Sequence, residues 1–261
     1  LHSFPTRRSS DLPAFYFFGG LGLAAAALAV ATLKEPRRGA ADQTRVESIP
    51  FGERIREMLA CPTGLLLTAA FLGFILVNAA YLTWTPTLLY RKFGMSLAEA
   101  GFHATFWHHL GAAAGVLAGG KLTDHLAVKD RIWRPRIQVV GLLLGAPFIY
   151  LLGMASERTV VFAALTLFGV FRGLYDSNLF TSLYEVIRPA SRATATGLML
   201  AVAFLGGGFA PVIIGWLGKR FTLGTALAST SACYLFAAAA IGLATVMYFR
   251  NDARKAMGAT E

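Results

Sequence analysis

The chain has 261 residues, of which 56% are hydrophobic and 15% are charged, and its formal net charge is +10. Charge-free stretches of roughly 20 residues recur along it and are apolar on all sides, whereas helices of a water-soluble protein carry polar stripes. This excludes a soluble bundle and predicts an all-α, polytopic membrane bundle of about seven transmembrane helices. No nucleophile, metal or paired-carboxylate pattern stands out, so neither an enzyme nor a cofactor is expected.

The positive charges are distributed unevenly between the two ends of the predicted helices. If the helices alternate in direction, 16 lysines and arginines fall on the side of the 34–62 loop and 5 on the opposite side. By the positive-inside rule, this loop and the C-terminus are expected to be cytoplasmic, with the chain in the inner (plasma) membrane. The basic balance therefore encodes orientation, and the expected partner is the lipid bilayer and not a nucleic acid.

The first twelve residues differ from everything that follows. They are polar, they join abruptly to an apolar segment at Pro13, and residues 4–12 resemble a translated sequencing adapter. We expect residues 1–12 to be a sequencing artefact, in which case the true N-terminus is missing; the alternative is a natural polar tail.

Seven spans are predicted after this segment, and the short connections from the second span onward make successive helices antiparallel neighbours. They cover residues 13–33, 64–89, 97–119, 137–155, 160–187, 193–217 and 226–249. The long loop between the first two spans carries four apolar residues at helical spacing, which predicts a short amphipathic helix on the membrane surface. These residues are Phe51, Ile55, Met58 and Leu59.

The second span has a polar face. Asn78, Tyr81 and Thr85 follow one another at spacings of three and four, so they share one side of a helix. Trp84 and Pro86 lie beside them, and the proline predicts a kink. Either this face lines a substrate cavity, or Tyr81 and Trp84 form an aromatic belt at the membrane interface.

The third span begins with a capping box, Ser96 and Glu99, and contains three histidines. The offsets of five and one between His103, His108 and His109 do not put three imidazoles on one face, so no metal site is expected. One histidine facing a cavity could relay protons, and His103 is taken as the candidate. Three glycines at four-residue spacing in the same span predict close helix packing. They are Gly111, Gly115 and Gly119.

The fifth span carries formal charges within its apolar run. Arg172 and Asp176 are four residues apart, on one face of a helix and within pairing reach. An arginine near the membrane midplane costs about 3 kcal/mol or more unless it is paired or faces a wet cavity. The pair is therefore a candidate site for an anionic solute, with Asp176 as the proton carrier, or it is a structural pair that lets the helix insert. Glu185 is a further proton-coupling candidate or an interfacial residue, and Asn178 is expected to assist in binding.

Several segments together carry a resemblance to a known family. The loop after the third span contains Gly120, Leu122 and Asp124, which resemble the cytoplasmic loop motif of major facilitator superfamily transporters; His125 replaces its basic residue, and its second glycine and basic end are absent. The Trp84-x-Pro86 element and the following FGMSLAEAG are similar to the seventh helix of that family and its exit. The GGGFAP sequence at 206–211 resembles the glycine-proline helix that occupies equivalent positions in both halves of that family, and RATATG at 192–197 resembles the start of its eleventh helix.

The resemblance implies a half-length architecture. Residues 13–33 would be the last helix of the N-terminal half, 34–62 the cytoplasmic loop between halves, 63–250 the C-terminal six-helix transporter domain, and 251–261 a cytoplasmic tail. The chain would then contain helices six to twelve of the fold, and its partner would be the missing N-terminal half of the same protein.

The resemblance also assigns roles to residues. The second and fifth spans would line the central cavity, which places Asn78, Tyr81, Trp84, Arg172, Asp176 and Asn178 at a substrate site. Gly120 and Asp124 would form a cytoplasmic gate, where Asp124 meets the positive end of a helix dipole. An arginine in this repeat is similar to the organic-anion and sugar-phosphate branch of the family.

The predicted function is secondary active transport of a small polar or anionic solute by alternating access, coupled to protons. The alternative is a non-transporting membrane scaffold or partner subunit, in which the Arg172–Asp176 pair is structural.

Overall fold

The computed structural model describes residues 12–33 and 49–258, and the described residues fold into helices. They belong to two compact units, one containing the first helix and the other containing all that follow. The expected sequencing artefact at 1–12 lies outside the described residues except for its last residue. Most of the 34–62 loop and the last three residues of the tail also lie outside them.

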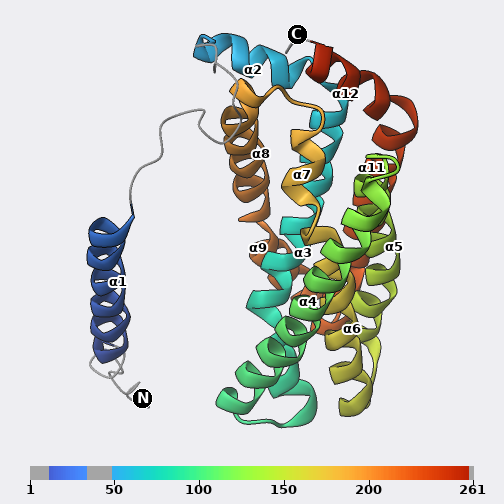
Figure 1. The fold of residues 1–261 in the computed structure, drawn as a ribbon. Coiled ribbons are helices and arrows are strands. Elements are labelled where there is room, and N and C mark those ends of the chain that lie inside the picture. The colour runs from blue at the N-terminus through green and yellow to red at the C-terminus, as the bar shows by residue number, and fades with distance from the viewer. Residues whose placement is uncertain (1–11, 34–48, 259–261) are drawn as a thin grey trace. The chain divides into compact units, whose positions relative to one another are not determined.

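Within the second unit, the helices follow one another with short connections (Figure 1). The first unit contains α1 (Leu12–Thr32). The second contains α2 (Phe51–Leu59), α3 (Pro62–Phe93), α4 (Leu97–Ala127), α5 (Trp133–Met154), α6 (Arg158–Asp176), α7 (Leu179–Tyr184), the 3-10 turn η2 (Pro189–Ser191), α8 (Arg192–Gly207), α9 (Ala210–Arg220), α10 (Leu223–Ser229), α11 (Ser231–Met247) and α12 (Phe249–Gly258). The predicted all-α class is confirmed.

Six helical segments in the described part of the chain are long and apolar enough to cross a membrane. They are Phe15–Thr32, Pro62–Phe93, Trp133–Met154, Arg158–Tyr184, Pro189–Arg220 and Leu223–Met247. The third predicted span is present as the 31-residue helix α4, but it is not among the six. Its three histidines lower the hydropathy of the segment that would otherwise qualify.

Three predicted spans are present as segments long enough to cross a membrane, and each is interrupted locally. The fifth breaks between α6 and α7 at Ser177 and Asn178, where Ser177 Oγ donates to the carbonyl of Leu174 (2.9 Å) and Asn178 Nδ2 donates to Ser177 Oγ (2.9 Å). Short polar side chains of this kind compete with the helix for backbone groups.

The other two interruptions have different local causes. The sixth span breaks between α8 and α9 at Gly208 and Phe209, after two further glycines and before Pro211. Glycine disfavours a helix because ordering it costs more backbone entropy than ordering other residues. Proline has no backbone N–H, so it cannot donate the hydrogen bond that would continue the helix. The seventh breaks at Thr230, whose hydroxyl donates to the carbonyl of Leu227 (2.7 Å), and again at Tyr248.

The second unit is organised around α3, which packs against α4, α8, α9 and α11. On one side, α4 crosses α6, which in turn packs on α5, and α5 contacts α10 and α11 (Figure 1). The crossing of α4 and α6 is made by small residues on both helices. A Cβ on Gly111 or Gly115 would collide with the backbone of α6, and one on Gly169 or Gly173 would collide with the backbone of α4. The predicted small-residue stripe on α4 is therefore a backbone-to-backbone contact.

Two short amphipathic helices, α2 and α12, cover the end of the bundle where α3 begins (Figure 1). The predicted helix around residue 55 is confirmed as α2, with Met58 buried and Phe51 and Leu59 exposed. Asp252 of α12 is buried, and its Oδ2 accepts a hydrogen bond from the backbone N–H of Thr63 (3.0 Å) at the start of α3. Helix α12 thus caps α3, the first of the long helices in this unit.

Candidate functional site

Arg172 lies in the last part of α6 and is surrounded by side chains from three helices. Its Nε is 3.3 Å from Asp176 Oδ2, one turn further along the same helix. Its Nη1 is 2.7 Å from Nε2 of His108 in α4, and its guanidinium carbon lies 5.3 Å from the centre of the Phe74 ring in α3. The arginine and aspartate side chains retain 17% and 28% of their exposure, so the pair remains accessible from one side.

His108 connects this pair to the polar face of α3. It is fully buried, and its ring lies 4.4 Å from the ring of Tyr81, measured between centres. The hydroxyl of Tyr81 donates to the carbonyl oxygen of Ala104, one turn before the histidine on α4. Tyr81 is therefore joined to Arg172 through His108, as a second layer around the guanidinium.

The two other α3 candidates have different environments. Asn78 lies one turn from Phe74 and from Tyr81 on the same stripe of α3, and its Oδ1 is buried without a hydrogen-bond partner among the described residues. Trp84 points to another neighbour: its Nε1 donates to the carbonyl of Pro211 (2.8 Å), and its ring covers Gly215 of α9. Asn78 thus shares a stripe of α3 with Phe74 and Tyr81, whereas Trp84 lies at the contact between α3 and α9.

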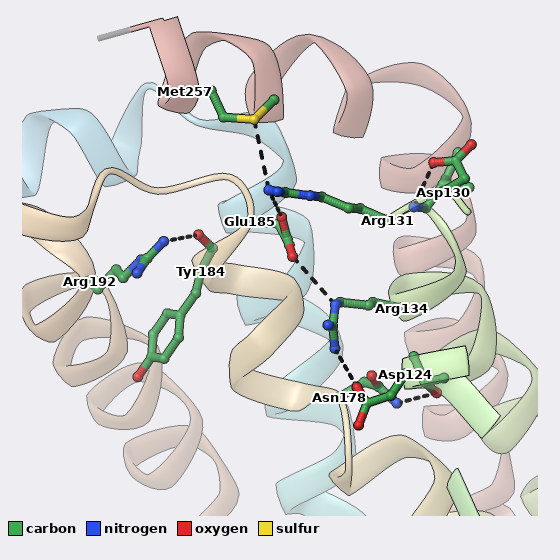
Figure 2. Close-up of polar contacts among 11 residues, drawn as sticks. Asp124, Asp130, Arg131, Arg134, Asn178, Tyr184, Glu185, Arg192 and Met257 are labelled. Atoms are coloured by element: carbon green, nitrogen blue, oxygen red, sulfur yellow. Dashed lines mark hydrogen bonds and ion pairs between the residues drawn. The ribbon is translucent and has the colours of Figure 1, made fainter. Parts of the chain in front are cut away.

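A second polar cluster lies toward the α2/α12 end of the bundle, and we call Asp124, Arg131, Arg134 and Glu185 the charge network (Figure 2). Glu185, just after α7, has its Oε2 2.8 Å from Arg131 Nη1 and its Oε1 3.4 Å from Arg134 Nε. Arg134 in turn lies 3.5 Å from Asp124 Oδ1 near the end of α4. These contacts join the segment just after α7 to the end of α4, the α4–α5 connection and the start of α5.

Polar side chains at the α6–α7 break continue the cluster. Asn178 is buried and its Nδ2 donates to Thr123 Oγ1 of α4 (2.9 Å). On the other side, Arg192 Nη2 donates to the carbonyl of Tyr184 (3.1 Å) (Figure 2). A hollow of about 570 Å3 opens between these groups and is lined by the charge network together with Ala127, Val128, Thr181, Tyr184 and Arg192.

The structure therefore divides the predicted site residues between two places. Arg172, Asp176 and Tyr81 belong to one group through His108, and Asn78 lies on the same α3 stripe as Tyr81. The second polar cluster contains Asn178 and Glu185, which are the remaining candidates from the fifth span. It also contains Asp124. A Cβ on Gly120 would meet nothing within 4 Å, so that glycine is not required by packing.

His103, the histidine expected to relay protons, lies away from these groups. Its Nδ1 accepts a hydrogen bond from Trp107 Nε1 (3.0 Å), and its ring stacks on Phe162 at 4.6 Å. His108 is the histidine that reaches Arg172, and the sequence did not single it out. The signal was present, because His108 precedes Gly111 and Gly115 at spacings of three and four and so belongs to the stripe that faces α6.

The arrangement around Arg172 suits the binding of an anion. A guanidinium has donors only and matches the two oxygens of a carboxylate or phosphate. The adjacent Asp176 can exchange a proton, while His108 and Phe74 fix the orientation of the arginine. Within the residues that the structure describes, no group of three or more metal-ligating side chains is close enough to hold an ion.

Comparison with known proteins identifies a family. A model of the Major Facilitator Superfamily matches residues 12–211. An MFS-type efflux pump of Mycolicibacterium smegmatis is 27% identical over 165 residues, which are 63% of this chain and 38% of that protein. A protein of Escherichia coli strain K12 named as a probable galactarate/D-glucarate transporter is 26% identical over 181 residues, 59% of this chain and 40% of that protein.

The fold is also found among solved structures. A bacterial homologue of the human lysosomal transporter Spinster, in an inward-facing and unoccupied conformation, superimposes with a TM-score of 0.55 at 22% identity. The match covers 95% of this chain and 60% of that protein. The chain spans about two fifths of the length of the two curated relatives described above.

Proposed function

The chain belongs to the Major Facilitator Superfamily, and from this premise we propose that it acts in secondary active transport of a small organic anion by alternating access. The family and the transporter relatives support a membrane transporter and not an enzyme. The observation that carries the substrate class is the partly exposed guanidinium of Arg172, held within apolar helices by Asp176 and His108. Two apolar residues would insert into a bilayer at lower cost, which supports a binding role for the pair.

The chain would perform this role together with an N-terminal half supplied by the same protein. The family match begins at α1, which we propose to be the last helix of that half, with α3–α11 forming the C-terminal half. The excess of positive charge at the α2/α12 end supports a cytoplasmic location for this end and for the C-terminus, with the protein in the plasma membrane. The charge network at this end would then act as the cytoplasmic gate, with Asp124 as one of its members.

The solute we propose is a carboxylate, with a polyhydroxy acid as the first choice. The Escherichia coli relative is named for galactarate and D-glucarate, which carry carboxylates at both ends. A carboxylate pairs with a guanidinium through two parallel hydrogen bonds. Asp176 would carry the coupling proton, because arginine does not lose its proton in proteins whereas a carboxyl beside it can gain one.

The test is uptake of D-glucarate into proteoliposomes that contain the complete transporter. We expect Arg172→Ala to lower uptake at least tenfold, since the charged donor is lost. Arg172→Lys should recover only part of it, because an ammonium cannot form the paired contact. The control is Arg136→Ala, which removes an exposed arginine that lies over the Trp133 ring. If Arg172→Ala transports as well as the wild type, the binding role is wrong.

Proton coupling is tested separately by Asp176→Asn, which keeps the shape of the side chain and removes its titration. Exchange of labelled for unlabelled solute should persist, while accumulation driven by an imposed pH gradient should be lost. Accumulation by Asp176→Asn at the wild-type level would assign the proton to another group. Failure of the intact protein to transport any organic anion would favour the alternative function of a membrane scaffold with a structural Arg172–Asp176 pair.

A further inference from the structure

The orientation of Arg172 is fixed from three directions. His108 in α4 accepts from Nη1, Asp176 in α6 lies beside Nε, and Phe74 in α3 covers one face of the guanidinium. Within the described residues, Nη2 takes part in no hydrogen bond or ion pair. The guanidinium is thus contacted on three sides: Nε forms an ion pair with Asp176 without a hydrogen bond, and the Nη2 edge has no partner among the described residues.

The contact between Arg172 and His108 determines the protonation of the imidazole. Because a guanidinium carries donors only, Nε2 of His108 must offer a lone pair, so the ring is neutral and its proton is on Nδ1. An imidazolium in this place would put two positive charges 2.7 Å apart in a fully buried position. The other titratable groups around it are Tyr81 on α3, His109 on its own helix and Asp176 beside the arginine, and none of them displaces Arg172 as its hydrogen-bond partner.

His108 is also held rigidly. Its backbone carbonyl meets the backbone of α6 at Gly169, so the helix cannot shift without breaking the close crossing. Its ring is packed between Tyr81 and Phe168, whose centres lie 4.4 and 4.7 Å away. An acceptor fixed in this way can preorganise a donor before a ligand arrives.

We infer that His108 is a positioning residue of the solute site: as a permanently neutral acceptor, it holds Arg172 so that the Nη2 edge is presented to a carboxylate of the solute. This inference rests on the proposed transport of an organic anion. It goes beyond that proposal because it gives His108 a role in positioning Arg172 and no role in proton coupling. His108 affects affinity through Arg172, whereas Asp176 carries the titration.

The test compares two substitutions of His108 in the complete transporter, with D-glucarate as the probe. His108→Gln keeps an acceptor oxygen and cannot titrate, whereas His108→Phe keeps a ring and removes the acceptor. We expect His108→Phe to raise KM about tenfold or more with a smaller change in maximal rate, because a hydrogen bond to a charged group is lost. His108→Gln should return KM to within a few-fold of the wild type and keep the wild-type dependence of uptake on pH.

The neighbouring histidines supply matched controls. His109→Phe and His103→Phe change the same residue type on the same helix, and we expect both to leave KM unchanged, since neither ring contacts Arg172. An unchanged KM in His108→Phe would overturn the inference. So would a flat pH profile in His108→Gln, because the histidine would then be the proton carrier.

A readout without transport separates this inference from the proposed function. Nitrogen-15 NMR of histidine-labelled protein in nanodiscs should show Nε2 of His108 unprotonated, and Arg172→Gln should shift that resonance. A protonated Nε2 would overturn the inference even if D-glucarate were transported. If Nε2 is unprotonated but no organic anion is transported, the proposed function is wrong, and so is the role of His108 in a solute site. The hydrogen bond between His108 and Arg172 would then be structural.

Discussion

The carbonyl oxygen of His108 occupies the place that a methyl group on Gly169 would need. The same relationship recurs one turn away, where a Cβ on Gly173 would meet the carbonyl of Ala112. Because the two helices touch through their backbones, the α4–α6 crossing fixes the position of His108 along α4 relative to Arg172 on α6. Helix packing and the contact of His108 with Arg172 therefore depend on the same few glycines.

The first prediction concerns these glycines. We expect Gly169→Ala to lower the free energy of unfolding by about 1–3 kcal/mol, because the added methyl collides with backbone that cannot move aside as a side chain would. Thermal unfolding in detergent measures the effect. Gly101→Ala on α4 is the control, since its Cβ would meet nothing within 4 Å. Equal stability of Gly169→Ala and the wild type would show that the helices are not in backbone contact.

The second prediction separates the two arginines that bind Glu185. Arg131 is closer to the carboxylate, at 2.8 Å against 3.4 Å, but its side chain is 58% exposed whereas that of Arg134 is 20% exposed. Water and salt screen the exposed pair more strongly, so we expect a coupling energy of about 0.5 kcal/mol or less with Arg131 and about 1 kcal/mol or more with Arg134.

Double-mutant cycles on thermal stability measure both couplings. They combine Glu185→Gln with Arg131→Met in one cycle and with Arg134→Met in the other. A larger coupling for Arg131 would mean that distance, and not exposure, controls the strength of these pairs.

The third prediction concerns Gln138 of α5, which is fully buried and has no hydrogen-bond partner for either amide atom among the described residues. It lies one turn before Gly141, which packs on the backbone of α6 near Tyr175. Replacing a buried, unpaired polar group by an apolar group of similar shape is neutral or stabilising. We therefore expect Gln138→Met to raise the unfolding temperature or leave it unchanged. A clear fall would show that the amide binds a partner.

The fourth prediction is a pH dependence at the contact between α2 and the connection after α7. Burial raises the pKa of Glu57, but hydrogen bonds from the side chain of Arg188, the hydroxyl of Ser191 and the backbone of Arg188 outweigh it, and the pKa is lowered from its ordinary value of 4.5. A lowered pKa means that the folded state binds the proton less readily than the unfolded state. The stabilisation is therefore complete above about pH 4.5 and is lost as the pH falls through the lowered value.

Comparison of the wild type with Glu57→Gln tests this sign. The wild type should unfold at a higher temperature near pH 7, and the difference should shrink toward about pH 3 as the carboxylate is protonated. A difference that grows in acid would contradict the lowered pKa. Glu53→Gln on the same helix is the control for the loss of one acidic charge from α2.

The fold could be predicted from the sequence because length and hydropathy alone specify membrane helices, whatever their partners. The pairing of Arg172 with Asp176 follows from their spacing of four, which acts within one helix. The choice of His108 over His103 could not be made in the same way, since it depends on which face of α4 meets α6. The partners of Glu185 are Arg131 in the α4–α5 connection and Arg134 at the start of α5, about 50 residues away in sequence, and no local pattern encodes them.

The interruptions of the predicted spans show a further limit. Hydropathy averages over many residues, so it does not register two polar residues such as Ser177 and Asn178 that redirect the backbone within an apolar run. Asn178 was expected to assist Arg172 because it lay on the same predicted helix. The break turns it instead toward Thr123, and its binding role stays a prediction.

The cap that Asp252 provides for α3 has a consequence for the order of assembly. During synthesis α3 leaves the ribosome first among the long helices of its unit, while Asp252 follows 189 residues after Thr63. Until then, the amide of Thr63 must bind water or a lipid headgroup. Helix α12 therefore completes the cap of α3 late in synthesis. We expect a chain cut before α12 to insert its spans yet leave the start of α3 uncapped and accessible to proteases.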